Sequence, residues 1–114
     1  MVKVRPTRFY SNRQEKKVAK TLGGKQVSNS GATAFHKGDV TLRDWLLECK
    51  TVTKVQKQFT LYKDWLIKNA QEAFEMNKRY NALTFDFGDG EQFYVIDERT
   101  FKKLVQLLEV ENEM

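Results

Sequence analysis

Three charged residues in the first half of the chain have types and a spacing that suit metal-assisted chemistry. Glu48 and Lys50 stand two positions apart within the otherwise apolar stretch LLECKT, and Asp39 comes before them, separated from Glu48 by eight residues. Two carboxylates can bind a hard cation such as Mg²⁺ through oxygen. An ammonium group beside that cation can orient or help deprotonate a water molecule, and it can stabilise charge on a reacting phosphate.

A hairpin would bring these three residues together. We expect two strands, 39–42 and 45–51, joined by a tight turn. Pairing around that turn places Asp39 directly opposite Glu48, and because side chains alternate along a strand, Lys50 shares the face of Glu48. Two facing carboxylates repel each other, and a divalent cation between them would remove that cost. The alternative is a surface hairpin in which lysine and glutamate form an ordinary cross-strand ion pair.

A third carboxylate, Glu15, lies in a helix predicted over 11–24. Its spacing from Val18 and Leu22 puts it on the apolar side of that helix, where an acidic group needs a partner. A nearby metal ion would provide one. The alternative is a capping box, in which Asn12 caps the helix and Glu15 occupies its third position.

The other segments complete an α/β pattern. The predicted elements that remain are a short strand and loop over 23–38, a polar loop or irregular edge over 51–59, a helix from Thr60 to about residue 78, strands over 81–87 and 91–97 joined by a turn at 88–90, and a last helix capped by Asp97. The apolar positions of the two later helices are Leu61, Trp65, Leu66, Ala70, Ala73 and Phe74, and then Phe101, Leu104, Val105 and Leu108. We therefore predict the order α-β-β-β-α-β-β-α, with one central mixed sheet flanked by helices.

Length and composition restrict the class of protein. A chain of 114 residues with 40% hydrophobic and 31% charged residues is typical of a single globular domain. We assign 1–114 to that domain, with a short basic arm over 1–10. No apolar run approaches the roughly 20 residues that cross a membrane, and the first residues lack the apolar core of a signal peptide. The single cysteine, Cys49, excludes an intrachain disulfide, should pack in the core, and favours a reducing, cytoplasmic setting.

Charge is divided unevenly between the two halves of the chain. Residues 1–58 carry 13 Lys/Arg and 4 Asp/Glu, whereas residues 59–114 carry 7 Lys/Arg and 11 Asp/Glu. A basic half favours a polyanionic partner, of which nucleic acid is the most common. The alternative is an ordinary solvated charged surface.

Taken together, these features resemble a known enzyme group. Asp39 followed by Glu48-Cys49-Lys50 is similar to the D-(x)n-E-x-K signature of the PD-(D/E)xK nuclease superfamily. The acid at Glu15 and the loop SNSGATAFHKGD make the chain most similar to the small Holliday junction resolvase-like endonucleases of archaea and phages. The similarity extends from about Ser11 to Leu108, although a glycine stands where the name-giving proline would be.

This resemblance implies a restriction-endonuclease-like fold and a Mg²⁺ site, with Mn²⁺ as a plausible substitute. It implies that Asp39 and Glu48 are metal ligands, together with the backbone carbonyl of Cys49. Glu15 would be a further acid at the site, acting through water, and Lys50 would be the catalytic lysine.

The implied activity is hydrolysis of phosphodiester bonds in DNA, with four-way junctions as substrate. A junction offers two strands to cut symmetrically, so a homodimer would suit it. Alternatives are a less specific nuclease of the same fold and a non-catalytic nucleic-acid-binding module. The candidate DNA-binding residues are Arg13, Lys25, Ser28, Ser30, Lys37, Lys54, Lys57, Gln58 and Lys63.

Overall fold

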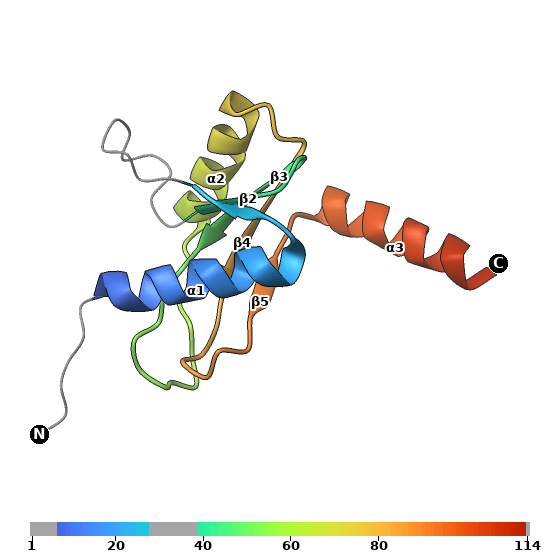
Figure 1. Cartoon of the computed structure of the whole chain (residues 1–114). Helices are drawn as coiled ribbons and strands as arrows, with labels where there is room; N and C mark the ends of the chain where they lie inside the picture. Colours follow the sequence, from blue (N-terminus) through green and yellow to red (C-terminus); the bar gives the residue numbers. More distant parts are fainter. Residues whose placement is uncertain (1–6, 28–38, 114) are drawn as a thin grey trace, which may run out of the picture.

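The computed structural model describes residues 7–27 and 39–113, which form three helices and a five-stranded sheet (Figure 1). The elements are α1 (Thr7–Leu22), β1 (Lys25–Gln26), β2 (Asp39–Thr41), β3 (Trp45–Cys49), α2 (Lys63–Glu75), β4 (Tyr80–Phe85), β5 (Phe93–Val95) and α3 (Glu98–Glu113). The order α-β-β-β-α-β-β-α predicted from the sequence is confirmed.

The sheet is mixed, as predicted, and its strands follow one another in the order β1-β2-β3-β4-β5. Neighbouring strands are antiparallel except β3 and β4, which are parallel and are connected through α2. The predicted pairing of β2 with β3 is confirmed residue by residue, with Asp39 opposite Glu48 and Val40 opposite Leu47. The tight turn between the strands sets this register. A slip of one residue would also be costly, because it would move the buried side chains to the opposite face of the sheet.

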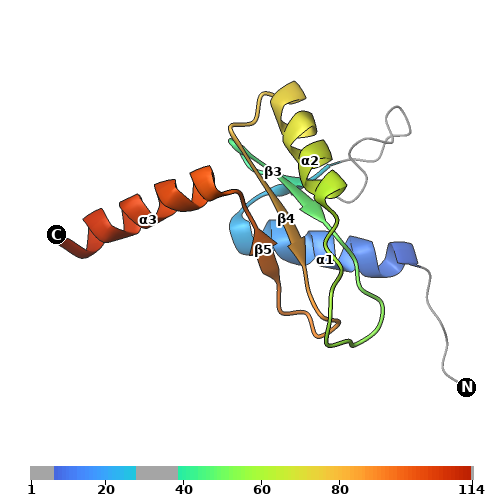
Figure 2. The same cartoon turned by 180° about the vertical axis from the view of Figure 1, so that it is seen from behind.

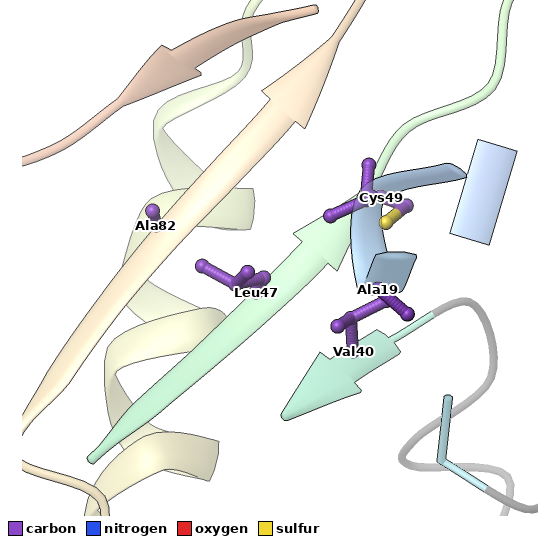
Figure 3. Packing of buried hydrophobic residues seen from close by; sticks show 6 residues of the cluster. Ala19, Val40, Leu47, Cys49 and Ala82 are labelled. Carbon is purple, nitrogen blue, oxygen red and sulfur yellow. The ribbon is translucent and has the colours of Figure 1, made fainter. Parts of the chain in front are cut away.

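The main core lies between α1 and one face of the sheet. Val18 and Ala19 of the helix pack on the buried strand residues Val40, Leu47, Cys49 and Ala82, five of these six being labelled in Figure 3. Cys49 is a free, buried thiol in this cluster, which confirms its predicted core position.

The other face of the sheet is covered by α2, as the view from behind illustrates (Figure 2). The apolar face predicted for this helix is partly wrong, because Ala70 and Phe74 are exposed while Asn69 and Glu72 are buried. Asn69 faces the sheet because its Nδ2 donates to the carbonyl oxygen of Ala82 at 2.9 Å. A buried polar group with such a partner can replace an apolar one on the packed face.

Several predicted boundaries are shifted. α1 begins at Thr7, so Ser11 and Asn12 are inside the helix and do not cap it. β4 and β5 are shorter than predicted because residues 86–92 form an irregular connection that bends at 87–90, with Gly88 and Gly90 at φ values of 91° and 86°. Glycine adopts this left-handed backbone conformation without strain, and the conformation ends the pairing of the two strands early.

The last helix begins as predicted. The Asp97 carboxylate accepts a hydrogen bond from the backbone N–H of Thr100 at 2.8 Å, as a helix cap does. From there α3 extends away from the sheet in both views (Figures 1 and 2). No helix in the described part of the chain is both long and apolar enough to cross a membrane.

Candidate functional site

The candidate site lies where β2 begins and β3 ends. Asp39 is the first residue of β2 and is only 1% exposed, and its strand partner is Glu48. The Nζ of Lys50 lies 3.2 Å from Oε1 of Glu48, so the three residues singled out in the sequence are brought together. Because Asp39 is buried, the surface hairpin of the alternative is wrong. Its lysine–glutamate ion pair is present, but between two residues of one strand segment and not across the hairpin.

Lys50 is held from several directions. Its backbone N–H donates to the carbonyl oxygen of Thr84 at 2.8 Å, which continues the parallel pairing of β3 and β4. Its Nζ lies 4.2 Å from the ring centroid of Trp65 on α2, a distance at which a cation is attracted to the ring face. The ammonium group therefore stands between a carboxylate and an aromatic ring, at the end of a strand.

Asp39 and three further carboxylates form an acidic cluster. Burial and, after it, the negative charges of Glu48, Glu72 and Glu15 together raise the pKa of Asp39 to about 8, while the positive charge of Lys50 opposes them. Glu72 reaches the cluster from α2 and is itself buried, with Lys68 at 4.0 Å as an ion-pair partner. Proximity of several acids in a buried place is costly unless positive charge or protons compensate.

Glu15 belongs to this cluster through α1. It is buried in the middle of the helix, so the alternative of a capping box is wrong. Asn12, the cap in that alternative, instead accepts a hydrogen bond from Gln26 of β1 at 3.0 Å. The charge of Glu15 also contributes, after burial, to raising the pKa of the Cys49 thiol, which keeps this cysteine neutral.

The oxygen donors of the cluster match a divalent cation only in part. Within residues 7–27 and 39–113, no group of three or more His, Cys, Asp or Glu side chains is arranged to hold a metal ion. Nevertheless, Oε2 of Glu48 is buried and has no hydrogen-bond partner among these residues. This atom and its strand partner Asp39 are hard oxygen donors in an acidic environment, which fits Mg²⁺ as two ligands. The backbone carbonyl of Cys49 as a third ligand stays a prediction.

A polar network connects α1 with the segment after Lys50. The Oγ1 of Thr51 donates to Oε1 of Gln14 at 3.2 Å, and Nε2 of Gln14 donates to Oε1 of Gln92 at 3.0 Å. Gln14 also lines a hollow of about 260 Å³ together with Arg13, Lys17 and residues of the 86–92 bend. The hollow opens beside Thr51, and its charged lining is mixed, with the basic Arg13 and Lys17 beside the acidic Asp86 and Asp89.

A second hollow of about 350 Å³ lies along residues 51–62, on the side of Tyr62 and Trp65. Lys54 lines it, and Thr51 is common to both hollows. Of the candidate DNA-binding residues, Arg13 therefore lines the first hollow and Lys54 lines the second. The other described candidates are also exposed. They are Lys25 in β1, Lys57 and Gln58 in the loop that contains Lys54, and Lys63 at the start of α2. Ser28, Ser30 and Lys37 lie outside the described residues.

Sequence reasoning missed two contributors to the site. Glu72 is not among the predicted site residues, because an acid between apolar helical positions usually faces solvent. For Trp65, core packing was favoured over stacking on a base. Their spacing was a usable signal, since residues seven apart on a helix share one face. The packed face of α2 thus supplies both an acid and an aromatic ring.

Comparisons of the chain with models of protein families, with curated proteins and with solved structures found no match.

Proposed function

We propose that this protein is a Mg²⁺-dependent endodeoxyribonuclease of the PD-(D/E)xK type, with a restriction-endonuclease-like fold and branched DNA, in particular four-way junctions, as its substrate. The observation that carries the proposal is the pairing of Asp39 with Glu48 in a buried acidic cluster, with Lys50 in contact with Glu48. These are the residue types that metal-assisted phosphodiester hydrolysis requires.

Each residue has a physical role in this proposal. Asp39 and Glu48 would hold Mg²⁺, which when bound polarises the scissile phosphate and lowers the pKa of water. Lys50, fixed by Glu48 and Trp65, orients the attacking water and stabilises negative charge that develops on the phosphate. Glu15 and Glu72 keep the cluster negative, which favours a divalent cation over a monovalent one.

Basic side chains on both sides of the site support a DNA substrate. Arg13 and Lys17 line one hollow and Lys54 lines the other, and Thr51, which follows Lys50 in the chain, lines both. A phosphate backbone that follows these side chains would pass the end of β3, next to Lys50. The preference for junctions comes from the resemblance of the sequence alone.

The test is a cleavage panel of junction, flap, duplex and single-stranded DNA with and without Mg²⁺. We expect Mg²⁺-dependent cutting, strongest on the junction, and its loss in Asp39→Asn. The matched control is Asp44→Asn, which changes an acid in the β2–β3 turn that pairs with Arg43, away from the cluster. Equal cutting of all substrates would favour the less specific nuclease. DNA binding without any cutting would favour the non-catalytic module.

Metal binding has a readout that does not depend on cutting. A ligand that binds only the folded state stabilises it by about 2.7 kcal/mol at a concentration of 100 Kd. We therefore expect Mg²⁺ to raise the melting temperature of the wild-type protein and of Asp44→Asn, but not of Asp39→Asn. An equal rise in all three proteins would exclude the assigned metal site.

A further inference from the structure

The last helix, α3, carries an apolar stripe that the domain does not cover. Its large hydrophobic side chains are between 37% and 63% exposed, and they are Phe101, Leu104, Val105, Leu107, Leu108 and Val110. Phe101, Leu104, Val105 and Leu108 have the i, i+3, i+4, i+7 spacing of a packed helix face. A contiguous stripe of this kind usually marks an interaction surface.

Contacts between α3 and the domain are concentrated at its start. Asp97 caps the helix, and Lys103 donates from Nζ to the Tyr80 hydroxyl at 3.0 Å. Beyond these residues α3 extends away from the sheet (Figures 1 and 2). A helix of this length without tertiary packing is marginally stable in water, so the stripe needs a partner.

The charges of α3 indicate which partner fits. Its first half carries Arg99, Lys102 and Lys103 against one acid, whereas its second half carries only the acids Glu109, Glu111 and Glu113. Two copies of such a helix attract each other when they run antiparallel, because the basic half of each then meets the acidic half of the other.

Glu111 makes the direction of pairing specific. It follows Leu104 by seven residues, so it continues the apolar stripe at the C-terminal end of α3. A parallel pair would bring the two Glu111 carboxylates together. An antiparallel pair instead places each beside the basic half of the other helix, and Leu104 of one copy then faces Leu108 of the other.

From this stripe and this charge pattern, we propose that α3 is a self-association element, through which two copies of the chain pair as antiparallel helices about a two-fold axis. The proposal does not rest on nuclease activity. A 16-residue helix is about 24 Å long, so the contact is smaller than a standard interface of roughly 1,600 Å². The dimer should therefore dissociate on dilution.

Sedimentation velocity of the full chain over a range of concentrations tests the association. We expect a monomer–dimer equilibrium, and Leu108→Glu should weaken it by roughly a hundredfold or more, because the change occurs twice in each dimer. The matched control is Phe74→Glu, since Phe74 is an 82% exposed aromatic residue on α2. Its dimer should be unchanged. Melting curves of both variants show whether the domain remains folded.

A wild-type chain that stays monomeric at millimolar concentration would overturn the proposal. So would a dimer that survives Leu108→Glu, or one that is lost in Phe74→Glu while that variant remains folded. If Leu108→Glu fails to fold, the wild-type equilibrium and the cross-linking below still decide the matter.

Cross-linking tests the direction of the helices. Lys102→Cys and Asn112→Cys introduce exposed thiols ten positions, or about 15 Å, apart on α3, and the native Cys49 is buried. In an antiparallel pair, a short bismaleimide should link the two variants to each other when they are mixed. Links mainly between like variants would show a parallel pair and contradict the proposal.

Discussion

At the scale of residues, the site is a set of acids whose ionisation depends on their neighbours. Asp39 and Glu48 could be placed opposite each other from the sequence because the turn and the alternation of side chains determine the register. Glu72 could not be placed in the same way. Its position depends on how α2 rotates against the sheet, and polar contacts such as that of Asn69 with Ala82 influence this rotation.

The raised pKa of Asp39 predicts how stability varies with pH in the absence of metal. Because the folded-state pKa is about 8 and the ordinary value is 3.8, the folded protein binds more protons than the unfolded chain between these values. Stability should therefore fall as the pH rises through this window, by an amount on the order of a few kcal/mol. Urea unfolding between pH 5 and 8 measures this dependence.

Substitution of the same residue tests the origin of the effect. Asp39→Asn should flatten the pH dependence and raise stability at pH 8. The wild-type carboxyl becomes negatively charged beside three acids as the pH rises, whereas the asparagine amide stays neutral. The control Asp44→Asn should keep the wild-type slope. If Asp39→Asn unfolds as readily at pH 8 as the wild type does, the carboxyl does not carry the electrostatic cost assigned to it.

Lys50 should contribute to the rate of cleavage much more than to DNA affinity. Many other basic residues remain in Lys50→Ala, so affinity should stay within a few-fold of the wild type. The rate at saturating DNA should fall by roughly 10²–10³ or more, as when a group that stabilises transition-state charge is removed. Lys20→Ala, an exposed lysine near the end of α1, is the control. A parallel loss of affinity and rate in Lys50→Ala would make this residue a phosphate anchor only.

At the scale of elements, the sequence predicted types and order better than boundaries and faces. The hairpin of β2 and β3 has a strong local signal, since two short segments rich in apolar residues flank a polar two-residue turn, Arg43-Asp44. The start of α1 was misplaced because Ser11 and Asn12 are good caps, but the helix continues through them. Local capping preference is a weak guide when the preceding residues can also be helical.

Close packing of two loops positions the segment after Lys50. The backbone N–H of Gln56 donates to the carbonyl oxygen of Phe87 at 2.9 Å. A Cβ atom at Gly88 would lie 2.5 Å from the carbonyl oxygen of Lys54, and Gly88 has a φ of 91°. Gly88→Ala should therefore be strained and should also push the two loops apart, at a combined cost of about 2 kcal/mol or more.

Gly23→Ala separates backbone strain from steric displacement, the two causes of the destabilisation expected in Gly88→Ala. Gly23 ends α1 at a φ of 72°, but a Cβ atom there would meet no atom within 4 Å. Its substitution should cost only the backbone strain of about 1 kcal/mol. Urea unfolding of both variants measures the difference. Equal destabilisation would mean that the loops around Gly88 relax without cost.

At the scale of the whole molecule, the fold brings basic side chains from different parts of the sequence to one end of the central strands. The parallel strands β3 and β4 have their carboxyl ends at one edge of the sheet, beside Lys50 and the hollows lined by Arg13 and Lys54. Arg79 precedes β4 and lies at the opposite end of these strands. The basic side chains near the site thus define the face that we expect to meet DNA.

Salt dependence of binding tests this face. The logarithm of affinity should fall by about 0.9 per logarithmic unit of salt for each phosphate that is neutralised. Charge reversal in Arg13→Glu or Lys54→Glu should therefore lower both affinity and slope. Arg79→Glu makes the same change of charge at the other end of the strands and should leave the slope nearly unchanged. Binding isotherms at several salt concentrations, with Ca²⁺ in place of Mg²⁺ to prevent cutting, provide the measurement. Equal changes of slope in all three variants would mean that DNA contacts both ends of the sheet.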